Sequence, residues 1–279
     1  MKDLINKYFI FDSVKLAYTD NQGEGKTILV THANGYSSSC YHFLYRKYGD
    51  RHRWIFLDFL GHGRSEPSLN FHNWDYFRDQ ILALIQKENL SNIIGVGHSL
   101  GGASLCLASK SSPSSFQSLL LLDPTVLNSG IIFLGMIFGN KLSKDALKRR
   151  RQFKDKEQVF KVFRRFPLYV KWNQDIFNDY VNSCFTEKEN GVVLSCPPEV
   201  ESKIFNSVPL FFPLKYKNIP VKVRIIIPQK YPVCTPYAAK KLIGKNKQSS
   251  FKLLEGENHL FPFEKPDYVL QELEILLNE

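Results

Sequence analysis

The sequence predicts an α/β fold, with a mostly parallel, doubly wound sheet and a helical cap inserted into it. Two observations lead to this fold class. Short apolar runs alternate with segments of helical periodicity at both ends of the chain, and one long middle segment breaks that alternation. With 279 residues, 43% of them hydrophobic, the chain is long enough to bury one large core.

Each element is predicted from its local pattern. In the first half, apolar or alternating runs bounded by turn residues indicate strands, and apolar positions three or four residues apart indicate helices. The predicted strands are 8–11, 15–19, 27–31, 54–57, 92–96 and 117–122, with helices over 74–87 and 99–109. In the last part, the predicted strands are 221–227 and 251–254, with helices over 236–243 and 266–277.

The middle segment, residues 126–212, is rich in Lys, Arg, Phe and Tyr and has helical stretches such as 144–163. A structureless loop of that length would be implausible in a compact domain. We therefore expect a core domain formed by residues 1–125 and 213–279, with residues 126–212 inserted as a helical cap, or lid.

Several protein classes are disfavoured by the composition. No apolar run reaches the ~18 residues that span a bilayer, and the first residues lack the apolar core of a signal peptide. The five cysteines form no C-x-x-C pair, so neither a disulfide framework nor a zinc site is expected. We expect a cytoplasmic protein that needs no metal and no organic cofactor.

The strongest local motif is G-x-S-x-G at residues 97–101, within Gly-His-Ser-Leu-Gly-Gly. An apolar strand precedes it and a helix of small and apolar residues follows, which is the context that a nucleophile elbow requires. A sharp turn would expose the Ser99 hydroxyl above the sheet, with Gly97 and Gly101 avoiding clashes. The Leu100 N–H, at the start of the helix, is the natural first donor to an oxyanion.

Four segments in order resemble the α/β-hydrolase superfamily, in its form with a cap after the sixth strand. They are His-Ala-Asn-Gly-Tyr at 32–36, Asp-Phe-Leu-Gly-His-Gly-Arg-Ser at 58–65, the elbow at 97–102, and Asn-His at 258–259. The resemblance covers nearly the whole chain except the cap. It implies a serine nucleophile, with the triad in the chain order Ser, acid, His.

His259 is the expected general base, because it is the only one of the seven histidines that follows Ser99. It lies in a loop after the last short strand and before a helix, where the resemblance places the base. His98 and His62 are interpreted as structural.

The expected position of the acidic member of the triad differs from the commoner family pattern. Many members place it after the seventh strand, where this chain has Tyr231, and residues 202–254 contain no Asp or Glu at all. The alternative family position is the end of the sixth strand, which here ends in Asp123. We expect Asp123 to accept the His259 Nδ1–H and orient the ring. The competing interpretation is that Asp123 only caps a turn before Pro124.

The second oxyanion donor is expected in the segment 32–36, which resembles the family's His-Gly oxyanion motif with two extra residues. If Gly35 matches the motif glycine, the donor is the Tyr36 N–H, which we favour. If His32 matches the motif histidine, the donor is the N–H of Ala33 or Asn34.

Two features of the cap bear on partners. The apolar stretch 131–138 predicts an acyl-binding wall, a gating element or ordinary core packing, with core packing slightly favoured. Residues 141–165 carry eleven basic and three acidic residues, a net charge of +8 within a chain of +10. A solvated surface is the first interpretation, and attraction to anionic lipid surfaces or anionic substrates is the second. Nucleic-acid binding is the third interpretation, and no recognised binding motif supports it.

The predicted function is a serine hydrolase that cleaves a carboxylic ester, or a related acyl bond, of a small or lipid-like substrate through an acyl-enzyme. An acyltransferase or a carbon–carbon hydrolase could use the same residues. Epoxide hydrolases and haloalkane dehalogenases are disfavoured, because those relatives have Asp at the nucleophile position. The alternative from another class is a non-catalytic ligand-binding member of the fold.

Overall fold

The computed structural model describes residues 2–127, 129–209 and 212–279, and its centre is an eight-stranded sheet. The strand order is β1-β2-β4-β3-β5-β6-β10-β11. The β1–β2 and β2–β4 pairs are antiparallel and the other five pairs are parallel, so the sheet is mostly parallel, as predicted. The strands are β1 (Ile5–Phe11), β2 (Val14–Asp20), β3 (Thr27–Thr31), β4 (Arg53–Asp58), β5 (Ile93–His98), β6 (Phe116–Leu122), β10 (Lys222–Pro228) and β11 (Ser250–Leu254).

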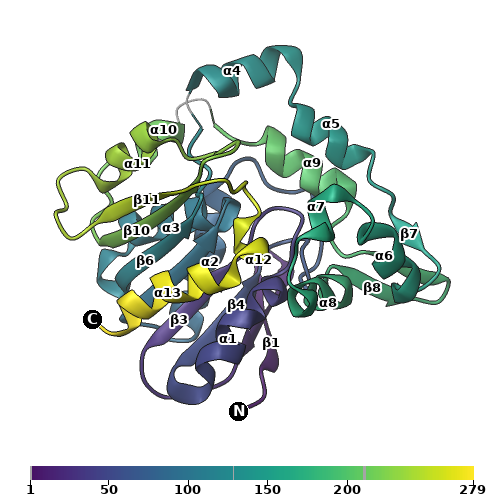
Figure 1. Cartoon of the computed structure of the whole chain (residues 1–279), viewed down its shortest axis with the longest axis horizontal. Helices are drawn as coiled ribbons and strands as arrows, with labels where there is room; N and C mark the ends of the chain where they lie inside the picture. Colours follow the sequence, from purple (N-terminus) through teal and green to yellow (C-terminus); the bar gives the residue numbers. More distant parts are fainter. Residues whose placement is uncertain (1, 128, 210–211) are drawn as a thin grey trace.

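Helices cover both faces of the sheet, because its strands are apolar on both sides (Figure 1). Along β3, Leu29 packs into a core with α2, α3 and α11, whereas Ile28 and Val30 pack into a second core with α1 and α13. These helices are α1 (His42–Tyr48), α2 (Asp75–Lys87), α3 (Leu100–Ser111), α11 (Pro236–Ile243) and α13 (Pro266–Leu277), with the short α12 (Phe261–Glu264) before α13. Helix α1 is an element that the sequence pattern did not predict.

The described residues between β6 and β10 add no strand to the central sheet. The elements from α4 to α9 lie at the top and right of Figure 1, and α10 lies beside α11 at the upper left; the segment contains its own small antiparallel sheet, in the order β7-β9-β8. Its elements are α4 (Ser129–Phe138), α5 (Lys141–Leu147), β7 (Gln152–Phe153), α6 (Lys156–Phe163), α7 (Pro167–Val170), α8 (Gln174–Ser183), β8 (Phe185–Lys188), β9 (Gly191–Leu194), α9 (Pro198–Asn206) and α10 (Phe212–Lys215). Within the described ranges, no helix is both long and apolar enough to cross a membrane.

The helical stretch predicted over 144–163 is wrong in its middle. Helix α5 ends at Leu147, before a run of four basic residues, and β7 pairs with β9. Helix α6 then starts afresh, with the Asp155 side chain accepting a hydrogen bond from the Gln158 N–H at 2.7 Å. The clustered like charges disfavour a continuous helix, and Asp155 is a strong N-cap.

Candidate active site

Ser99 lies at the sharp turn between β5 and α3, in the backbone conformation φ 53°, ψ −115°. This left-handed region is costly for a residue with a side chain, so the surrounding packing must enforce it. A Cβ on Gly97 would lie 2.7 Å from the Gly102 backbone, and one on Gly101 would lie 2.5 Å from the Thr31 carbonyl oxygen. Glycine is therefore required on both sides of the turn that presents Ser99.

Backbone hydrogen bonds fix this turn to the neighbouring strands. The Ser99 N–H donates to the Leu122 carbonyl at 3.1 Å, and the Thr125 N–H donates to the Ser99 carbonyl at 3.1 Å. The Thr125 hydroxyl also lies 3.1 Å from the Ser99 Oγ. Thr125 was not among the residues predicted for the site, although it follows Asp123 by only two positions at the end of β6.

His259 and Asp123, which are 136 residues apart in the chain, are joined by a hydrogen bond. The His259 Nδ1–H donates to Asp123 Oδ2 at 2.6 Å. The Asp123 side chain is fully buried, whereas the His259 side chain is 27% exposed. This contact fixes the ring orientation and the tautomer, leaving Nε2 available as a base.

The Asp123 carboxylate is held in place by the loop that follows β10. The N–H groups of Val233 and Cys234 donate to it at 3.1 Å and 2.8 Å. This is the same loop in which many relatives carry the acid, according to the resemblance above. Here the loop supplies backbone donors to a carboxylate that comes from β6.

A chain of hydrogen bonds ties His259 to the 32–36 segment through His98. His98 Nε2 contacts the His259 carbonyl at 2.9 Å, and Nδ1 contacts the Tyr41 hydroxyl at 2.6 Å. The Tyr41 oxygen accepts a hydrogen bond from the Ala33 N–H at 3.3 Å. Burial lowers the pKa of His98 well below its usual value, so the ring is neutral and serves as a structural connector, as the sequence indicated.

The geometry of residues 32–36 does not support the expectation that the Tyr36 N–H is the second oxyanion donor. The Tyr36 N–H donates to the Ala33 carbonyl at 3.2 Å, and the Gly35 N–H donates to His62 Nε2 at 2.9 Å. Among the described residues, no acceptor is present for the Asn34 N–H, and Asn34 lines the same cavity as Ser99 and Leu100. The geometry therefore favours Asn34, one of the alternatives left open, because the turn itself consumes the Tyr36 donor.

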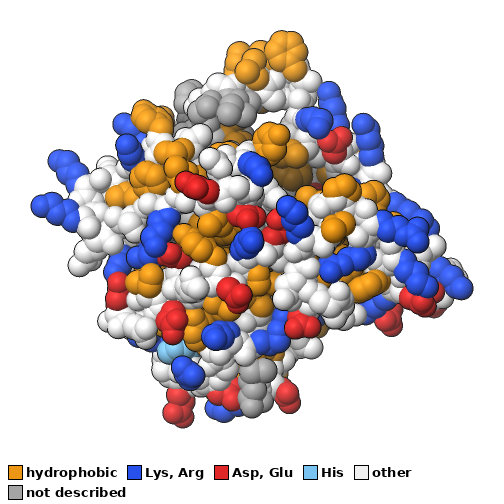
Figure 2. Space-filling model, in the orientation of Figure 1, with side chains coloured by type: hydrophobic (Ala, Val, Ile, Leu, Met, Phe, Trp, Pro, Cys, Tyr) orange, Lys and Arg blue, Asp and Glu red, His pale blue; other side chains and the backbone are white. Residues whose placement is uncertain are grey.

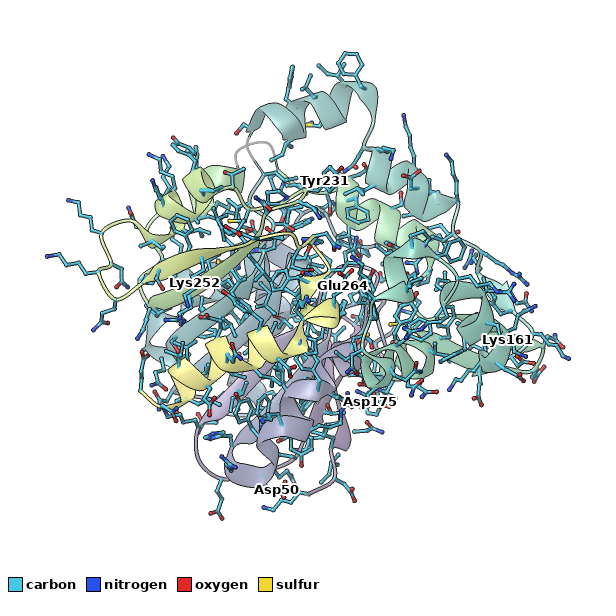
Figure 3. The ribbon with its side chains drawn as sticks, viewed as in Figure 1. Asp50, Lys161, Asp175, Tyr231, Lys252 and Glu264 are labelled. Carbon is cyan, nitrogen blue, oxygen red and sulfur yellow. The ribbon has the colours of Figure 1, made fainter. Side chains whose placement is uncertain are left out.

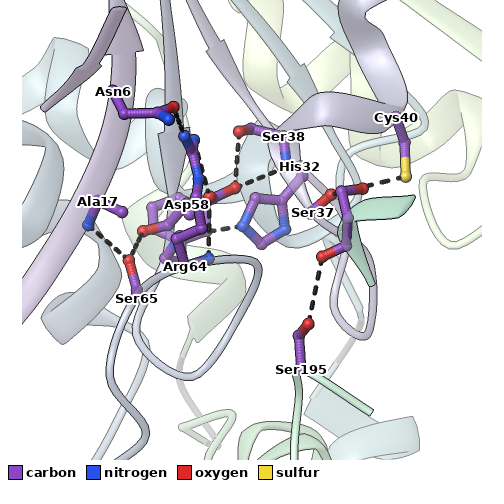
Figure 4. Close-up of polar contacts among 12 residues, drawn as sticks. Asn6, Ala17, His32, Ser37, Ser38, Cys40, Asp58, Arg64, Ser65 and Ser195 are labelled. Atoms are coloured by element: carbon purple, nitrogen blue, oxygen red, sulfur yellow. Dashed lines mark hydrogen bonds and ion pairs between the residues drawn. The ribbon is translucent and has the colours of Figure 1, made fainter. Parts of the chain in front are cut away.

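Behind this segment, a buried polar network holds it against the β4 end of the sheet (Figure 4). Asp58 accepts hydrogen bonds from the Ser38 N–H at 2.9 Å and from the Ser38 hydroxyl at 2.6 Å. His32 Nε2 accepts a hydrogen bond from the Phe59 N–H at 3.0 Å. These residues fix the loop and do not line the cavity, which agrees with a structural part for the Asp58 segment.

Ser99 and His259 open into a cavity of about 410 Å³ beneath the insertion between β6 and β10. Tyr231 lies near the centre of Figure 3, below α4, and forms part of the cavity's rim. Most of the lining is apolar, so the cavity suits a hydrocarbon or acyl group more than a strongly hydrated one. The apolar lining residues include Leu127, Leu142, Leu168, Phe205, Val208 and Val233.

A second cavity, of about 790 Å³, lies between α5, α6, α7 and α9 and shares Tyr36, Leu142, Leu168, Glu201 and Phe205 with the first. Glu201 Oε2 is 2.5 Å from the Arg149 guanidinium. This buried pair neutralises one of the eleven basic residues of the 141–165 segment. Among the described residues, no cluster of three or more metal-ligating side chains is present.

Comparison with known proteins identifies the family. Residues 28–272 match the model of the alpha/beta hydrolase family, so the chain belongs to that family. A stretch of 88 residues is 36% identical to the abhydrolase domain-containing protein AFT2-1 of Alternaria alternata. That stretch is 31% of this chain and 30% of the relative, so the chain matches about a third of the relative's length.

Solved structures of the same fold cover almost the entire chain. E-2-(acetamidomethylene)succinate hydrolase superposes with a TM-score of 0.83 at 18% identity, covering 99% of this chain and 100% of that one. An esterase from Exiguobacterium antarcticum superposes with a TM-score of 0.72 at 16% identity, covering 99% and 100%. At these identities the likeness establishes the α/β-hydrolase fold.

Proposed function

We propose that the protein is a serine hydrolase that cleaves carboxylic esters, or related acyl bonds, of apolar substrates. One observation carries the proposal: His259, whose Nδ1 lies 2.6 Å from Asp123 Oδ2, lines the same cavity as Ser99. A nucleophile, an oriented base and two N–H donors around one apolar cavity are what acyl transfer requires.

In this proposal the Ser99 hydroxyl turns from Thr125 toward His259 Nε2 and attacks the substrate carbonyl as His259 takes its proton. The oxyanion that forms accepts hydrogen bonds from the N–H groups of Leu100 and Asn34. His259 then returns the proton to the leaving alcohol, and Asp123 stabilises the imidazolium throughout. Water, activated by His259, attacks the acyl-enzyme and restores the Ser99 hydroxyl as the acid leaves.

The proposal includes a cytoplasmic setting. All five cysteines are free, and Cys40 and Cys184 remain unbonded with their sulfurs 3.8 Å apart. Unpaired neighbouring thiols fit a reducing compartment better than an oxidising one.

The direct test is labelling with a fluorophosphonate probe, followed by assay on p-nitrophenyl esters of graded acyl length. The wild type should react with the probe and hydrolyse the esters, and Ser99→Ala should do neither. Ser109→Ala is the matched control, since Ser109 is a buried serine at the far end of α3, bonded to the Cys106 carbonyl. Equal labelling of wild type and Ser99→Ala, or no labelling of the wild type, would favour the non-catalytic ligand-binding alternative.

A further inference from the structure

Helix α4 exposes large apolar side chains to solvent. Ile132 packs into the core, whereas five others are 51% to 73% exposed: Phe133, Leu134, Met136, Ile137 and Phe138. Figure 2 shows an apolar group at the top of the molecule, where Figure 1 places α4. The core packing slightly favoured from the sequence is therefore wrong for most of this stretch. A helix that is apolar all round is normally covered by something else.

The two ends of α4 lead directly to the catalytic cavity. Leu127, before the helix, and Asn140 and Leu142, after it, all line the cavity that contains Ser99. Leu142 is itself 55% exposed, and Tyr231, on the same rim, is 87% exposed. The exposed helix is thus continuous with an apolar rim around the entrance of the site.

Positive charge follows immediately along the chain. The side chains of Lys141 and Lys148, at the two ends of α5, are 91% and 77% exposed. The Lys144 ammonium donates to the Phe138 carbonyl at 3.2 Å, so a cation lies at the C-terminal end of α4. An apolar helix bordered by lysines is the combination by which proteins bind at the interface of an anionic bilayer.

We propose that α4 docks on the surface of an anionic lipid bilayer and inserts its exposed side chains among the headgroups. The lysines of α5 would then face lipid phosphates and carboxylates, and the cavity entrance would face the membrane. A second copy of this chain would fit this surface less well, because the lysines of the two copies would lie against each other and repel. Docking does not depend on the proposed hydrolase activity. Only the delivery of a membrane-dissolved ester to Ser99 rests on the proposed function.

The test is co-sedimentation with vesicles of phosphatidylcholine alone and of phosphatidylcholine with phosphatidylserine. The wild type should sediment with the anionic vesicles at low ionic strength and much less in about 1 M salt, where the screening length is about 3 Å. The double variant Met136→Asp/Phe138→Asp should lower the partition coefficient roughly tenfold or more. Ile10→Asp, on the edge strand β1 of the central sheet, replaces an equally exposed apolar side chain and should bind as the wild type does.

Three results would overturn the docking proposal. These are wild-type protein that stays in the supernatant, equal binding of the α4 variant, and light scattering that shows a dimer which the α4 variant abolishes. Turnover of a short soluble ester is measured in parallel, and the α4 variant should retain it, because Met136 and Phe138 do not line the cavity. A protein that binds vesicles but labels with no probe would support docking while overturning the proposed hydrolase.

Discussion

At the scale of single residues, two of the candidate site residues have a strained backbone conformation. Ser99 and Asp123 both have positive φ values, of 53° and 41°. Each follows a parallel strand of the sheet, β5 or β6, and the two strands are neighbours. Strain of this kind persists only where surrounding contacts enforce it. Here the enforcing contacts are backbone hydrogen bonds: those of Ser99 with Leu122 and Thr125, and the bond from the Asp123 N–H to the Ile226 carbonyl at 2.8 Å.

Asp123→Asn tests the acid at this scale. The amide can still accept the Cys234 N–H, so the fold should persist, but it favours the wrong tautomer of His259. We expect kcat to fall by about 10³- to 10⁴-fold, measured on the best ester of the p-nitrophenyl series. Asp20→Asn is the control, since Asp20 is equally buried but pairs with Arg53 at the other end of the sheet; it should lower stability and leave kcat of the folded protein unchanged. Near-normal kcat in Asp123→Asn would remove Asp123 from the triad.

At the scale of elements, polar contacts join α5 to α9 beside the cavity. The hydroxyls of Ser143 and Ser202 are 2.7 Å apart, and Arg149, just after α5, pairs with Glu201 of α9. A buried ion pair adds little net stability, but either partner left alone is costly. The pair therefore fixes how these two helices meet more than it strengthens the fold.

A double-mutant cycle tests this pair. Glu201→Met should lower the free energy of unfolding by about 3 kcal/mol, because the largely buried Arg149, whose side chain is 22% exposed, is left without its counter-charge. Arg149→Met/Glu201→Met should recover most of that loss. Urea denaturation monitors both. Arg151→Met is the control: it breaks the exposed pair with Glu199 and should cost well under about 1 kcal/mol. A double variant no more stable than Glu201→Met would contradict this account.

At the scale of the whole molecule, three buried histidines and the partly buried His42 contribute to the response to acid. Burial lowers the pKa of His42 to about 4, lowers that of His32, and lowers those of His62 and His98 well below the usual value. The folded state therefore binds fewer protons than the unfolded state below about pH 6.5. Stability is fully present above that pH and is lost as the pH falls toward the folded pKa values.

Denaturant midpoints measured from pH 8 to pH 4.5 should show this loss. Above about pH 7 the midpoint should be nearly constant, and below about pH 6.5 each buried histidine should remove up to about 1.4 kcal/mol per pH unit. His42→Phe should make the decline shallower while preserving the ring contact with Phe56. A midpoint that stays flat from pH 7 to pH 5 would contradict the assignment of neutral buried histidines.

The local sequence pattern was sufficient to predict most of the strands and helices of the core. Strand β3 and helices α11 and α13 begin and end where predicted, because their apolar periodicity and flanking Gly or Pro residues are local signals. The region between α5 and β9 was harder. The pairing of β7 depends on a partner strand about forty residues away, and no local signal of two residues can reveal that.

For this protein, the sequence alone determined the fold class and the candidates for the site: Ser99 in its G-x-S-x-G turn, the downstream His259 and, through the absence of carboxylates over 202–254, Asp123. These features depend on residue type, order and local turn chemistry. Only the tertiary structure showed which N–H groups of the 32–36 segment are bonded within the described residues, which loop holds Asp123, and that most of α4 faces solvent. Those outcomes depend on which distant groups meet, because apolar core walls and apolar surfaces have the same sequence pattern until the fold assigns them an inside and an outside.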